Sequence, residues 1–357
     1  MSIPLFSPAA VDPDELDAHT VGRAALLSRL TDRITGAVRD GSRPHTLLLG
    51  PHGSGKTHTL HLVLYRALSD RETAKRTLPL ILPEDSLAIG SYGDLLVELI
   101  RPHHPNASDL RNDVVALERA ILDHADGRMI LVAAENLDRV FAAIGTAGQG
   151  SLRAWVETST AVTLFATAPA LFRTVASRSH PWYGSFIVEE LPALTASEGG
   201  EIVARANEEL SAYVRSPEGQ HRIAAIDRLI SGSPRLWHII ADTADVPALQ
   251  ALTPVVAALM DRIAPSYQQR LWQLPTGEQR LVVELARGDG SRTVSDLAAA
   301  VGVSNQTASA ALGRLANTRW VVAAKSEADR RVTYYDLDDP LLRHVVRYRE
   351  RGIVPTP

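Results

Sequence analysis

The 357-residue sequence contains no cysteine, which excludes disulfides, thiolate catalysis, cysteine-ligated zinc and iron–sulfur clusters. Aromatic residues make up only 5% of the chain, and of its 37 basic residues only three are lysine. No apolar run approaches the roughly 20 residues that cross a bilayer, and the N-terminus lacks the charged segment and apolar core of a secretory signal. We therefore expect a cytoplasmic protein with no membrane partner.

The composition that remains is that of a globular chain. Hydrophobic residues make up 45% and charged residues 22% of the sequence, and at roughly 100–200 residues per domain the length predicts two or three domains. The net charge is −4, but residues 274–357 carry 12 basic and 10 acidic side chains. This small basic excess near the C-terminus favours contact with nucleic acid only weakly.

Residues 21–192 follow an N-terminal extension at 1–20 and alternate short apolar strands with helical patterns. The expected helices include 60–68, 95–100 and 114–122, and the expected strands are 46–49, 78–82, 129–134, 162–166 and 186–188. Apolar strands alternating with helices predict a parallel sheet that is covered on both faces. We therefore assign residues 21–192 to an α/β core.

The remainder of the chain changes pattern twice. Residues 193–273 show helical spacing alone, with helices expected at 198–213, 222–230, 234–244 and 255–263, and predict an α-helical lid and connector. Residues 274–357 predict three short helices, two β-strands and a last helix. The fold class is therefore α/β, a parallel-sheet core followed by a helical lid and a winged helix-turn-helix domain.

The most informative segment is the octapeptide from Gly50 to Thr57, which has the spacing Gly-x4-Gly-Lys-Thr between a predicted strand and a predicted helix. This is the context of a phosphate-binding P-loop. Its glycines let backbone N–H groups converge on phosphates, Lys56 bridges the β- and γ-phosphates, and Thr57 places a hydroxyl on Mg²⁺. We predict an ATP and Mg²⁺ site formed by Gly50, Pro51, His52, Gly53, Ser54, Gly55, Lys56, Thr57 and His58.

A P-loop ATPase also needs a carboxylate for Mg²⁺ at the end of a neighbouring strand, and usually a second acid that activates water. The predicted strand at 129–134 is followed by the run Glu135-Asn136-Leu137-Asp138. If Glu135 takes the metal side, Asn136 occupies the position of the base; in the alternative register Glu135 is the base and Ala134 stands on the metal side. One acid is missing in both registers, which predicts nucleotide binding with slow or partner-dependent hydrolysis.

These motifs together resemble AAA+ ATPases of the replication-initiator (origin-recognition) and archaeal-ATPase type, to which STAND signalling ATPases are related. The motifs, in chain order, are Val21-Gly22-Arg23, the P-loop, Glu135-Asn136-Leu137-Asp138 and Gly232-Ser233-Pro234-Arg235. The resemblance covers about residues 20–262. It implies a nucleotide-binding core with a helical lid, and the P-loop is its most specific element.

The resemblance also implies roles for residues outside the P-loop. It places Gly22 and Arg23 beside the adenine. Thr167, at the end of the fourth expected strand, takes the position of the sensor-1 polar group. Arg235, at the start of a lid helix, takes the position of the sensor-2 arginine that reaches the γ-phosphate.

Such ATPases assemble through their cores and complete each site with an arginine finger from a neighbouring subunit. The resemblance therefore implies a homo-oligomer. Arg178, or with less support Arg173, is the candidate finger, and both are expected in the helix before Phe186.

The C-terminal segment has a helix-turn-helix pattern, with helices at 293–300 and 304–316 around the turn 301–303. Ser304 is a suitable N-cap for the second helix. The exposed face of that helix presents side chains that can meet base edges or phosphates in a major groove. We predict a double-stranded DNA interface that includes Ser304, Asn305, Gln306, Thr307, Ser309 and Arg314.

A β-hairpin at 320–337, with a charged tip at 325–331, completes a winged helix that resembles the MarR-like class. In that class a wing arginine enters the minor groove, and Arg330 or Arg331 is the candidate here. Winged helices are also common protein–protein modules, and this recognition helix carries a single basic residue. A protein partner therefore remains an alternative to DNA.

Two functions from different classes fit these features. The first is an ATP-binding AAA+ switch that controls DNA binding through the winged helix. The second is a STAND-like signalling or defence ATPase whose winged helix mediates protein contacts. The recognition helix and the arginine-tipped wing favour the first, and the low basicity of residues 274–357 favours the second. The missing acid disfavours a dedicated DNA motor.

Overall fold

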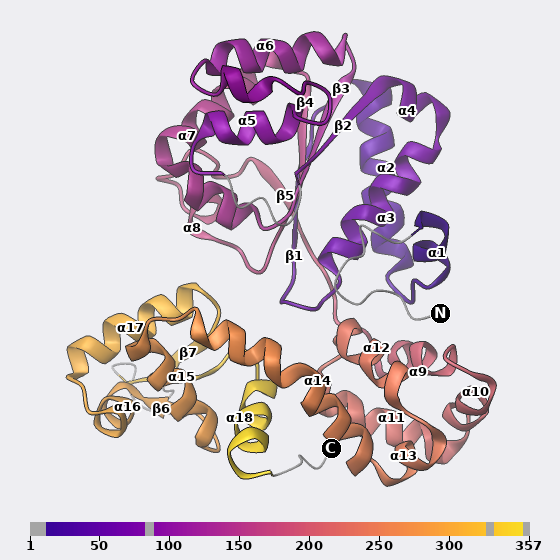
Figure 1. Cartoon of the computed structure of the whole chain (residues 1–357), viewed down its shortest axis with the longest axis vertical. Helices are drawn as coiled ribbons and strands as arrows, with labels where there is room; N and C mark the ends of the chain where they lie inside the picture. The colour runs from indigo at the N-terminus through magenta and orange to yellow at the C-terminus, as the bar shows by residue number, and fades with distance from the viewer. Residues whose placement is uncertain (1–11, 83–88, 326–331, 353–357) are drawn as a thin grey trace. The chain divides into compact units, whose positions relative to one another are not determined.

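The structure, a computed structural model, describes residues 12–82, 89–325 and 332–352. It divides into two compact units, Met1–Pro192 and Ala193–Pro357. Figure 1 shows that the first unit contains a central sheet with helices on both sides and that the second is mostly helical. None of the described helices combines the length and the apolar character that a membrane span requires.

The first unit is built on five parallel strands, which confirms the predicted parallel sheet. The strand order is β2-β3-β4-β1-β5. Since β1 lies between β4 and β5, the chain leaves β1 at a point where the strand order reverses, and open parallel sheets bind ligands at such points. The strands are β1 (His45–Leu49), β2 (Thr77–Leu82), β3 (Met129–Ala134), β4 (Val162–Ala168) and β5 (Phe186–Glu190).

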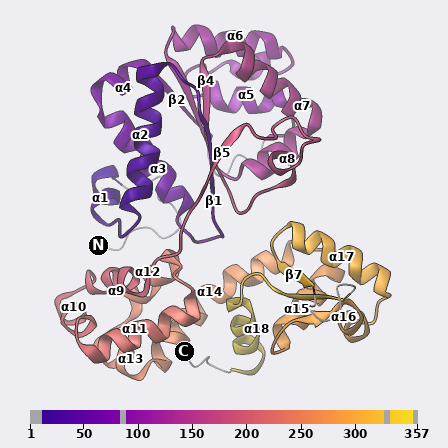
Figure 2. The same ribbon diagram turned by 180° about the vertical axis from the view of Figure 1, so that it is seen from behind.

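Helices cover both faces of this sheet (Figures 1 and 2). One face carries α1 (Pro13–Ala18), α2 (Ala24–Asp40), α3 (Lys56–Ser69) and α4 (Arg71–Arg76), and the other carries α5 (Tyr92–Ile100), α6 (Val114–Ala125), α7 (Leu137–Ser159) and α8 (Arg173–Ala176). A short 3-10 helix spans Ala107–Leu110. Side chains alternate along the strands: Leu48 and Leu131 pack on the first face, and Leu47 and Val132 pack on the second. Both faces are therefore hydrophobic core.

The described part of the N-terminal extension lies on the α2–α3 layer. Leu16 of α1 is buried in the same core as α2 and α3, and Asp17 pairs with Arg66 of α3 at 2.5 Å. This places Thr20 and the residues after it beside the P-loop.

The second unit begins with six helices: α9 (Ala196–Ala204), α10 (Glu208–Val214), α11 (Pro217–Ile230), α12 (Pro234–Thr243), α13 (Val246–Ala251) and α14 (Thr253–Trp272). The single helix predicted at 198–213 is wrong, because the Asn207 side chain accepts from the Leu210 N–H at 2.8 Å and starts α10. The end predicted at residue 263 is also wrong: α14 continues through Pro265, since Tyr267 and Leu271 pack on the winged-helix core.

The C-terminal part of this unit is a winged helix, which confirms the fold expected there. Its elements are α15 (Thr276–Arg287), β6 (Arg292–Thr293), α16 (Val294–Val301), α17 (Asn305–Asn317), β7 (Val321–Lys325), β8 (Thr333–Leu337) and α18 (Leu341–Arg351). The strands form an antiparallel sheet in the order β6-β8-β7. The strand β6 was not predicted, because its two residues are too few to show an alternation of apolar and polar side chains.

Candidate nucleotide site and winged-helix interface

The P-loop connects the carboxyl end of β1 to the first turn of α3. Gly53 and Gly55 adopt φ values of 80° and 90°, in the left-handed region that favours glycine. At Gly50 a Cβ atom would lie 2.6 Å from the Ser54 Oγ and 3.2 Å from the Leu191 Cβ, so a larger residue would have to displace the Ser54 side chain. No described side chain caps the N-terminus of α3. The positive end of the helix dipole is therefore directed at this tight loop.

Lys56 lies inside the loop and is 8% exposed. Its ammonium group donates to the Gly50 carbonyl oxygen at 2.8 Å and to the Pro51 carbonyl oxygen at 3.0 Å. A phosphate in the loop is a stronger acceptor for this charge than a carbonyl oxygen. The loop therefore fits phosphate, with an ammonium group already inside it.

Thr57 and Glu135 meet at the same edge of the sheet. The Thr57 hydroxyl donates to Glu135 Oε2, and Glu135 follows β3 with 8% exposure. On the other side, His61 Nε2 lies 3.9 Å from Glu135 Oε1, and burial lowers the pKa of His61. A hydroxyl and a carboxylate are hard oxygen donors, which Mg²⁺ prefers.

A full protein cage for a metal is absent from the described part of the chain, where no group of three or more His, Asp or Glu side chains could hold an ion. Mg²⁺ in nucleotide sites commonly takes one or two protein oxygens and completes its shell with phosphates and water. Thr57 and Glu135 together fit that pattern.

Asn136 is held where β3 meets α7. Its backbone is left-handed, with φ 51°, and its N–H donates to the Thr167 Oγ1 at 3.3 Å. Thr167 lies on β4 and is fully buried. The Asn136 side chain is an amide, which can orient a water molecule but cannot take its proton.

Asp138 lies in the first turn of α7. It ends the motif Glu135-Asn136-Leu137-Asp138, and its place in that motif predicts no role for it. Burial raises the pKa of its carboxyl group, which the charge of Lys56 partly opposes. Its Oδ1 is buried and has no hydrogen-bond partner in the described part of the chain. Local sequence shows the acid but not its burial, so no pattern could have found this property.

Residues 20–23 lie against the loop. Gly22 and Arg23 both have left-handed backbone, with φ 71° and φ 60°, and this turn starts α2. The Arg23 guanidinium donates to the Ser54 carbonyl oxygen at 2.7 Å and to the Pro192 carbonyl oxygen at 2.5 Å. The His58 Nε2 lies 2.7 Å from the Thr20 Oγ1. Arg23 therefore ties the P-loop to the end of the segment that follows β5.

The structure corrects the environment expected for the candidate arginine finger. Arg173 starts α8, but that helix ends at Ala176, so Arg178 is not in the helix before Phe186 as predicted. Arg178 is exposed, and its guanidinium lies 6.0 Å from the centre of the Tyr183 ring. The helix ends there because Ser177 adopts an extended backbone, with φ −102° and ψ 130°.

Arg235, the candidate sensor-2 residue, belongs to the second unit. It is the second residue of α12 and is partly buried. Burial lowers the pKa of its guanidinium.

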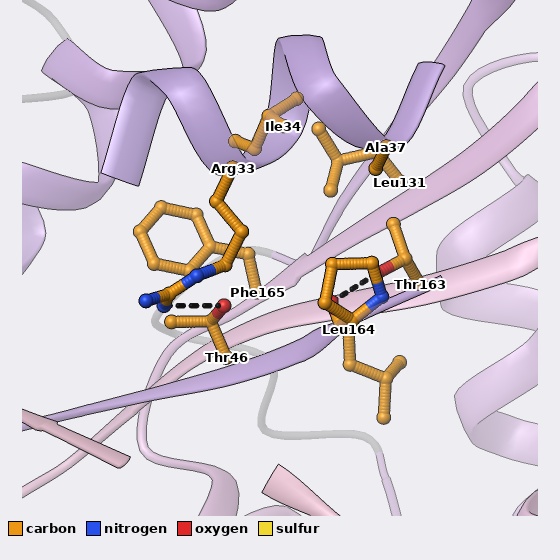
Figure 3. Close-up of a pocket in the computed structure, with 9 residues that line it drawn as sticks. Arg33, Ile34, Ala37, Thr46, Leu131, Thr163, Leu164 and Phe165 are labelled. Carbon is orange, nitrogen blue, oxygen red and sulfur yellow. Dashed lines mark hydrogen bonds between the residues drawn. The ribbon is translucent and has the colours of Figure 1, made fainter. Parts of the chain in front are cut away.

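A shallow pocket at the opposite edge of the sheet is not a second nucleotide site (Figure 3). It lies at the amino ends of the strands, and its polar groups bond to one another: Arg33 donates to the Thr46 Oγ1 at 3.2 Å, and the Thr163 hydroxyl donates to the Pro44 carbonyl oxygen at 2.5 Å. Its lining is otherwise apolar, and the full set is Arg33, Ile34, Ala37, Pro44, Thr46, Leu131, Thr163, Leu164 and Phe165.

The predicted DNA-binding residues fall into three groups in the structure. Ser304 caps α17, since its Oγ accepts from the Thr307 N–H at 3.1 Å and lies 2.9 Å from the Thr307 hydroxyl. The others on α17 are exposed: Asn305, Gln306, Ser309 and Arg314. The wing candidates Arg330 and Arg331 lie outside the described residues.

Comparisons with known proteins agree with this architecture. The MarR family model matches residues 272–332, which include α15, α16 and α17. A search of curated proteins gives no match.

Three solved structures cover nearly the whole chain. A Walker-type ATPase of Pyrococcus abyssi has a TM-score of 0.60 and 14% identity, over 92% of this chain and 96% of that one. The ORC2 protein of Aeropyrum pernix, in ADPNP–ADP complexes, has a TM-score of 0.63 and 14% identity, over 91% and 92%. The ORC1 protein of Aeropyrum pernix in complex with DNA has a TM-score of 0.54 and 15% identity, over 93% of both chains. The chain thus has the AAA+ ATPase fold of origin-recognition proteins and archaeal Walker-type ATPases, with a C-terminal winged helix similar to the MarR family.

Proposed function

We propose that this protein is an ATP-binding AAA+ switch that controls DNA binding through its C-terminal winged helix. The observation that carries the proposal is the edge of the sheet at the P-loop. There Lys56 lies inside the loop and the Thr57 hydroxyl contacts the Glu135 carboxylate. These are an ammonium, a hydroxyl and a carboxylate in the arrangement that a nucleotide triphosphate with Mg²⁺ requires.

In this proposal the P-loop backbone and the N-terminus of α3 hold the phosphates. Lys56 exchanges the Gly50 and Pro51 carbonyl oxygens for phosphate oxygens, which are stronger acceptors. Thr57 and Glu135 hold Mg²⁺, whose chemistry is to neutralise charge on the phosphates. Gly22 and Arg23 border the nucleotide on the side of α2.

Hydrolysis is slow or depends on a partner. The contact between Thr57 and Glu135 favours the register in which Glu135 takes the metal side. Asn136 then occupies the position of the water-activating acid, and an amide has no proton-accepting carboxylate. A long-lived ATP-bound state suits a switch, because the protein then stays in one conformation until ATP is hydrolysed or released.

The switch consists of a nucleotide-dependent change in residues 193–273, the proposed lid. ATP shifts a conformational equilibrium only as far as it binds one state more tightly than the other. Thr167, Arg235 and, from a neighbouring copy, Arg178 are the proposed groups that make this difference by contacting the γ-phosphate. The protein therefore self-associates through the ATPase core in the ATP state.

The output is double-stranded DNA binding by residues 274–357. Support comes from the exposed polar face of α17, with Asn305, Gln306 and Ser309 at its N-terminal end. The ORC1 protein of Aeropyrum pernix, which shares the fold, was solved in complex with DNA.

Fluorescence anisotropy on a mixed-sequence DNA duplex tests the proposal, with ATP, ADP or no nucleotide and at two salt concentrations. We expect binding that depends on ATP and whose log affinity falls with log salt by about 0.9 per phosphate contact. Folded protein that binds ATP but no DNA in any of the three states would contradict the DNA output.

A second candidate function is a STAND-like signalling ATPase, in which the winged helix contacts a protein. One observation favours it: several winged-helix arginines pair with carboxylates of the same fold, among them Arg287, Arg292, Arg343 and Arg347. Such pairing lowers the positive charge available to DNA.

A further inference from the structure

Most basic side chains of the winged helix are engaged within the fold. Among the described arginines of residues 276–350, six use a terminal amino group in an internal hydrogen bond: Arg280, Arg287, Arg292, Arg343, Arg347 and Arg349. Two arginines in this described range, Arg314 and Arg319, do not. These two keep the NH1 and NH2 groups available for a ligand.

Arg314 is the one of these two that lies on the recognition helix α17. Its Nε donates to the Glu278 Oε1 at 2.7 Å. The Arg314 side chain is 63% exposed and that of Glu278 is 8% exposed. The buried Glu278 carboxylate thus accepts a hydrogen bond from the Nε of an exposed guanidinium.

This geometry fixes the guanidinium before any ligand arrives. A charge-assisted hydrogen bond at Nε restrains the long side chain, so less conformational entropy remains to be lost on binding. The guanidinium is planar and its donors form a rigid fork. With Nε bonded to Glu278, the NH1 and NH2 groups of the exposed guanidinium make no hydrogen bond to the described residues.

Two residues close to Arg314 on α17 have little or no side chain. Ala310 lies one helical turn before Arg314 and Gly313 directly precedes it; both are exposed, and a Cβ atom at Gly313 would meet nothing within 4 Å. Figures 1 and 2 show α17 along the outer edge of the winged helix. A base edge can therefore approach this face of the helix closely.

We propose that Glu278 is a positioning residue that holds Arg314 to read a guanine in the major groove. Two parallel N–H groups match the O6 and N7 acceptors of guanine, and this arginine–guanine pair is the commonest specific contact of its kind. The inference rests on the proposed DNA binding and adds the base and the residue pair that recognises it. Arg319 lies after α17, paired through Nε with Asp338 at 3.2 Å, and receives no base-reading role.

The test is enrichment of DNA duplexes from a random-sequence pool by the full chain with ATP. Four variants are compared with the wild type: Arg314→Ala, Glu278→Gln, and two controls. Glu284→Gln weakens an ion pair whose arginine, Arg292, uses its terminal groups internally. Arg319→Ala removes an exposed arginine outside the recognition helix.

We expect the wild type and both controls to enrich a motif with a defined guanine, Arg314→Ala to lose preference for that guanine alone, and Glu278→Gln, whose amide oxygen accepts a weaker bond from Nε, to show a reduced preference for it. Replacing it with 7-deazaguanine, which lacks the N7 acceptor, weakens wild-type binding by roughly tenfold to a hundredfold, leaves Arg314→Ala unaffected and weakens Glu278→Gln less than the wild type. Since Arg314→Ala leaves a buried carboxylate unpaired, the double variant Glu278→Gln/Arg314→Ala repeats the test if that protein does not fold.

Three results would overturn the inference. If the variants enrich the same guanine as the wild type, Arg314 reads no base. If they lose affinity equally for all sequences, with a smaller salt dependence, Arg314 contacts phosphate instead. If the wild type binds ATP but enriches no DNA at all, the proposed DNA function fails as well, which separates that failure from the other two.

Discussion

The nucleotide edge of the first unit and the winged helix of the second handle charge in opposite ways. At the P-loop, buried charged groups from separate elements converge on one small volume: Lys56 and Glu135 are each 8% exposed. On the winged helix, arginines are dispersed over the surface and paired with nearby acids, as Arg287 is with Glu350 at 2.7 Å and Arg343 with Asp336 at 2.6 Å. The first region gathers charged groups at one site, and in the second region acidic side chains neutralise the arginines.

The difference sets what each region can bind. Buried charge in a loop closed by glycines gives high affinity for one compact polyanion, because water is excluded and the groups are already in place. A neutralised surface binds the extended DNA polyanion weakly, so its affinity depends on a few hydrogen bonds to base edges. Nucleotide binding should therefore tolerate salt better than DNA binding does.

The largest effect is expected from Lys56→Ala, which tests the concentrated charge directly. The variant loses charge-assisted hydrogen bonds to two phosphates, at about 1.5–3 kcal/mol each, so ATP affinity falls by roughly a thousandfold. Titration with a fluorescent ATP analogue measures it. Lys75→Ala, at an exposed residue of α4, is the matched control and keeps wild-type affinity. Unchanged affinity in folded Lys56→Ala would refute the site.

Asn136→Glu tests the missing acid. A carboxylate at this position supplies the proton acceptor that the amide lacks, and general-base catalysis raises the ATPase rate by roughly a hundredfold. In the same register, Glu135→Gln lowers Mg²⁺-dependent ATP affinity because a metal oxygen loses its charge. Phosphate release and nucleotide titration measure the two effects.

The opposite pair of results decides for the other register. If Asn136→Glu leaves the rate unchanged while Glu135→Gln stops hydrolysis with ATP affinity intact, then Glu135 is the base.

Periodicity predicted the elements whose apolar residues recur without interruption. The central strands β1, β3 and β4 lie where regular apolar runs occur, because both faces of a parallel sheet are buried there. The edge strands β2 and β5 were predicted from their apolar runs as well, although Ile81, Ile187 and Val188 are exposed. It failed where glycine or proline interrupts a helix. The sequence analysis missed α7, which contains a non-helical residue at Gly145 (φ 65°, ψ 177°) and still buries Phe141 and Trp155. Tertiary packing holds that helix together, and a local pattern does not report packing.

The candidate functional residues also divide into those that a local motif predicts and those that only the packing brings together. Residues 50–57 are contiguous, so their chemistry can be read from spacing, and Glu135 follows from its place at the end of a strand. Arg314 and Glu278, by contrast, are 36 residues apart in the chain. Neither residue belongs to a motif that names the other, and only the packing of α15 against α17 brings them together.

His45 is a partly buried histidine at the start of β1 in the first unit. Burial lowers the pKa of His45 to about 4 from 6.5, among the rings of Trp182 and Phe186. Between pH 6.5 and 4 the unfolded chain holds a proton on His45 that the folded chain does not. The stability of the first unit is therefore retained above pH 6.5 and falls by about 2–3 kcal/mol as the pH decreases to 4.

Urea unfolding at several pH values, followed by circular dichroism, measures this loss. His45→Gln removes the titration while its amide oxygen can still accept from the Leu164 N–H, which now donates to the His45 Nδ1 at 3.1 Å. We expect a smaller pH slope in this variant, and the wild-type slope in His221→Gln, at an exposed residue of α11. Equal slopes for wild type and His45→Gln would show that His45 is not held neutral.

The smallest effect is expected where α14 meets the winged helix, and it tests whether the second unit transmits the nucleotide state. The Tyr267 hydroxyl donates to the Asp339 Oδ2 at 2.5 Å, and the Asp339 Oδ1 accepts from the Leu341 N–H that begins α18. Arg270 lies 5.6 Å from the Tyr267 ring centre and 4.9 Å from that of Trp320.

Tyr267→Phe removes the bond to Asp339 and keeps the ring. We expect it to lower the free energy of unfolding by about 1 kcal/mol, to leave ATP affinity unchanged, and to reduce the difference in DNA affinity between the ATP and ADP states. Tyr348→Phe is the matched control, because Tyr348 joins α18 to α14 through Asp261 at 2.7 Å without contacting Arg270. If both variants keep the full ATP effect on DNA affinity, the signal does not pass through the bond between Tyr267 and Asp339.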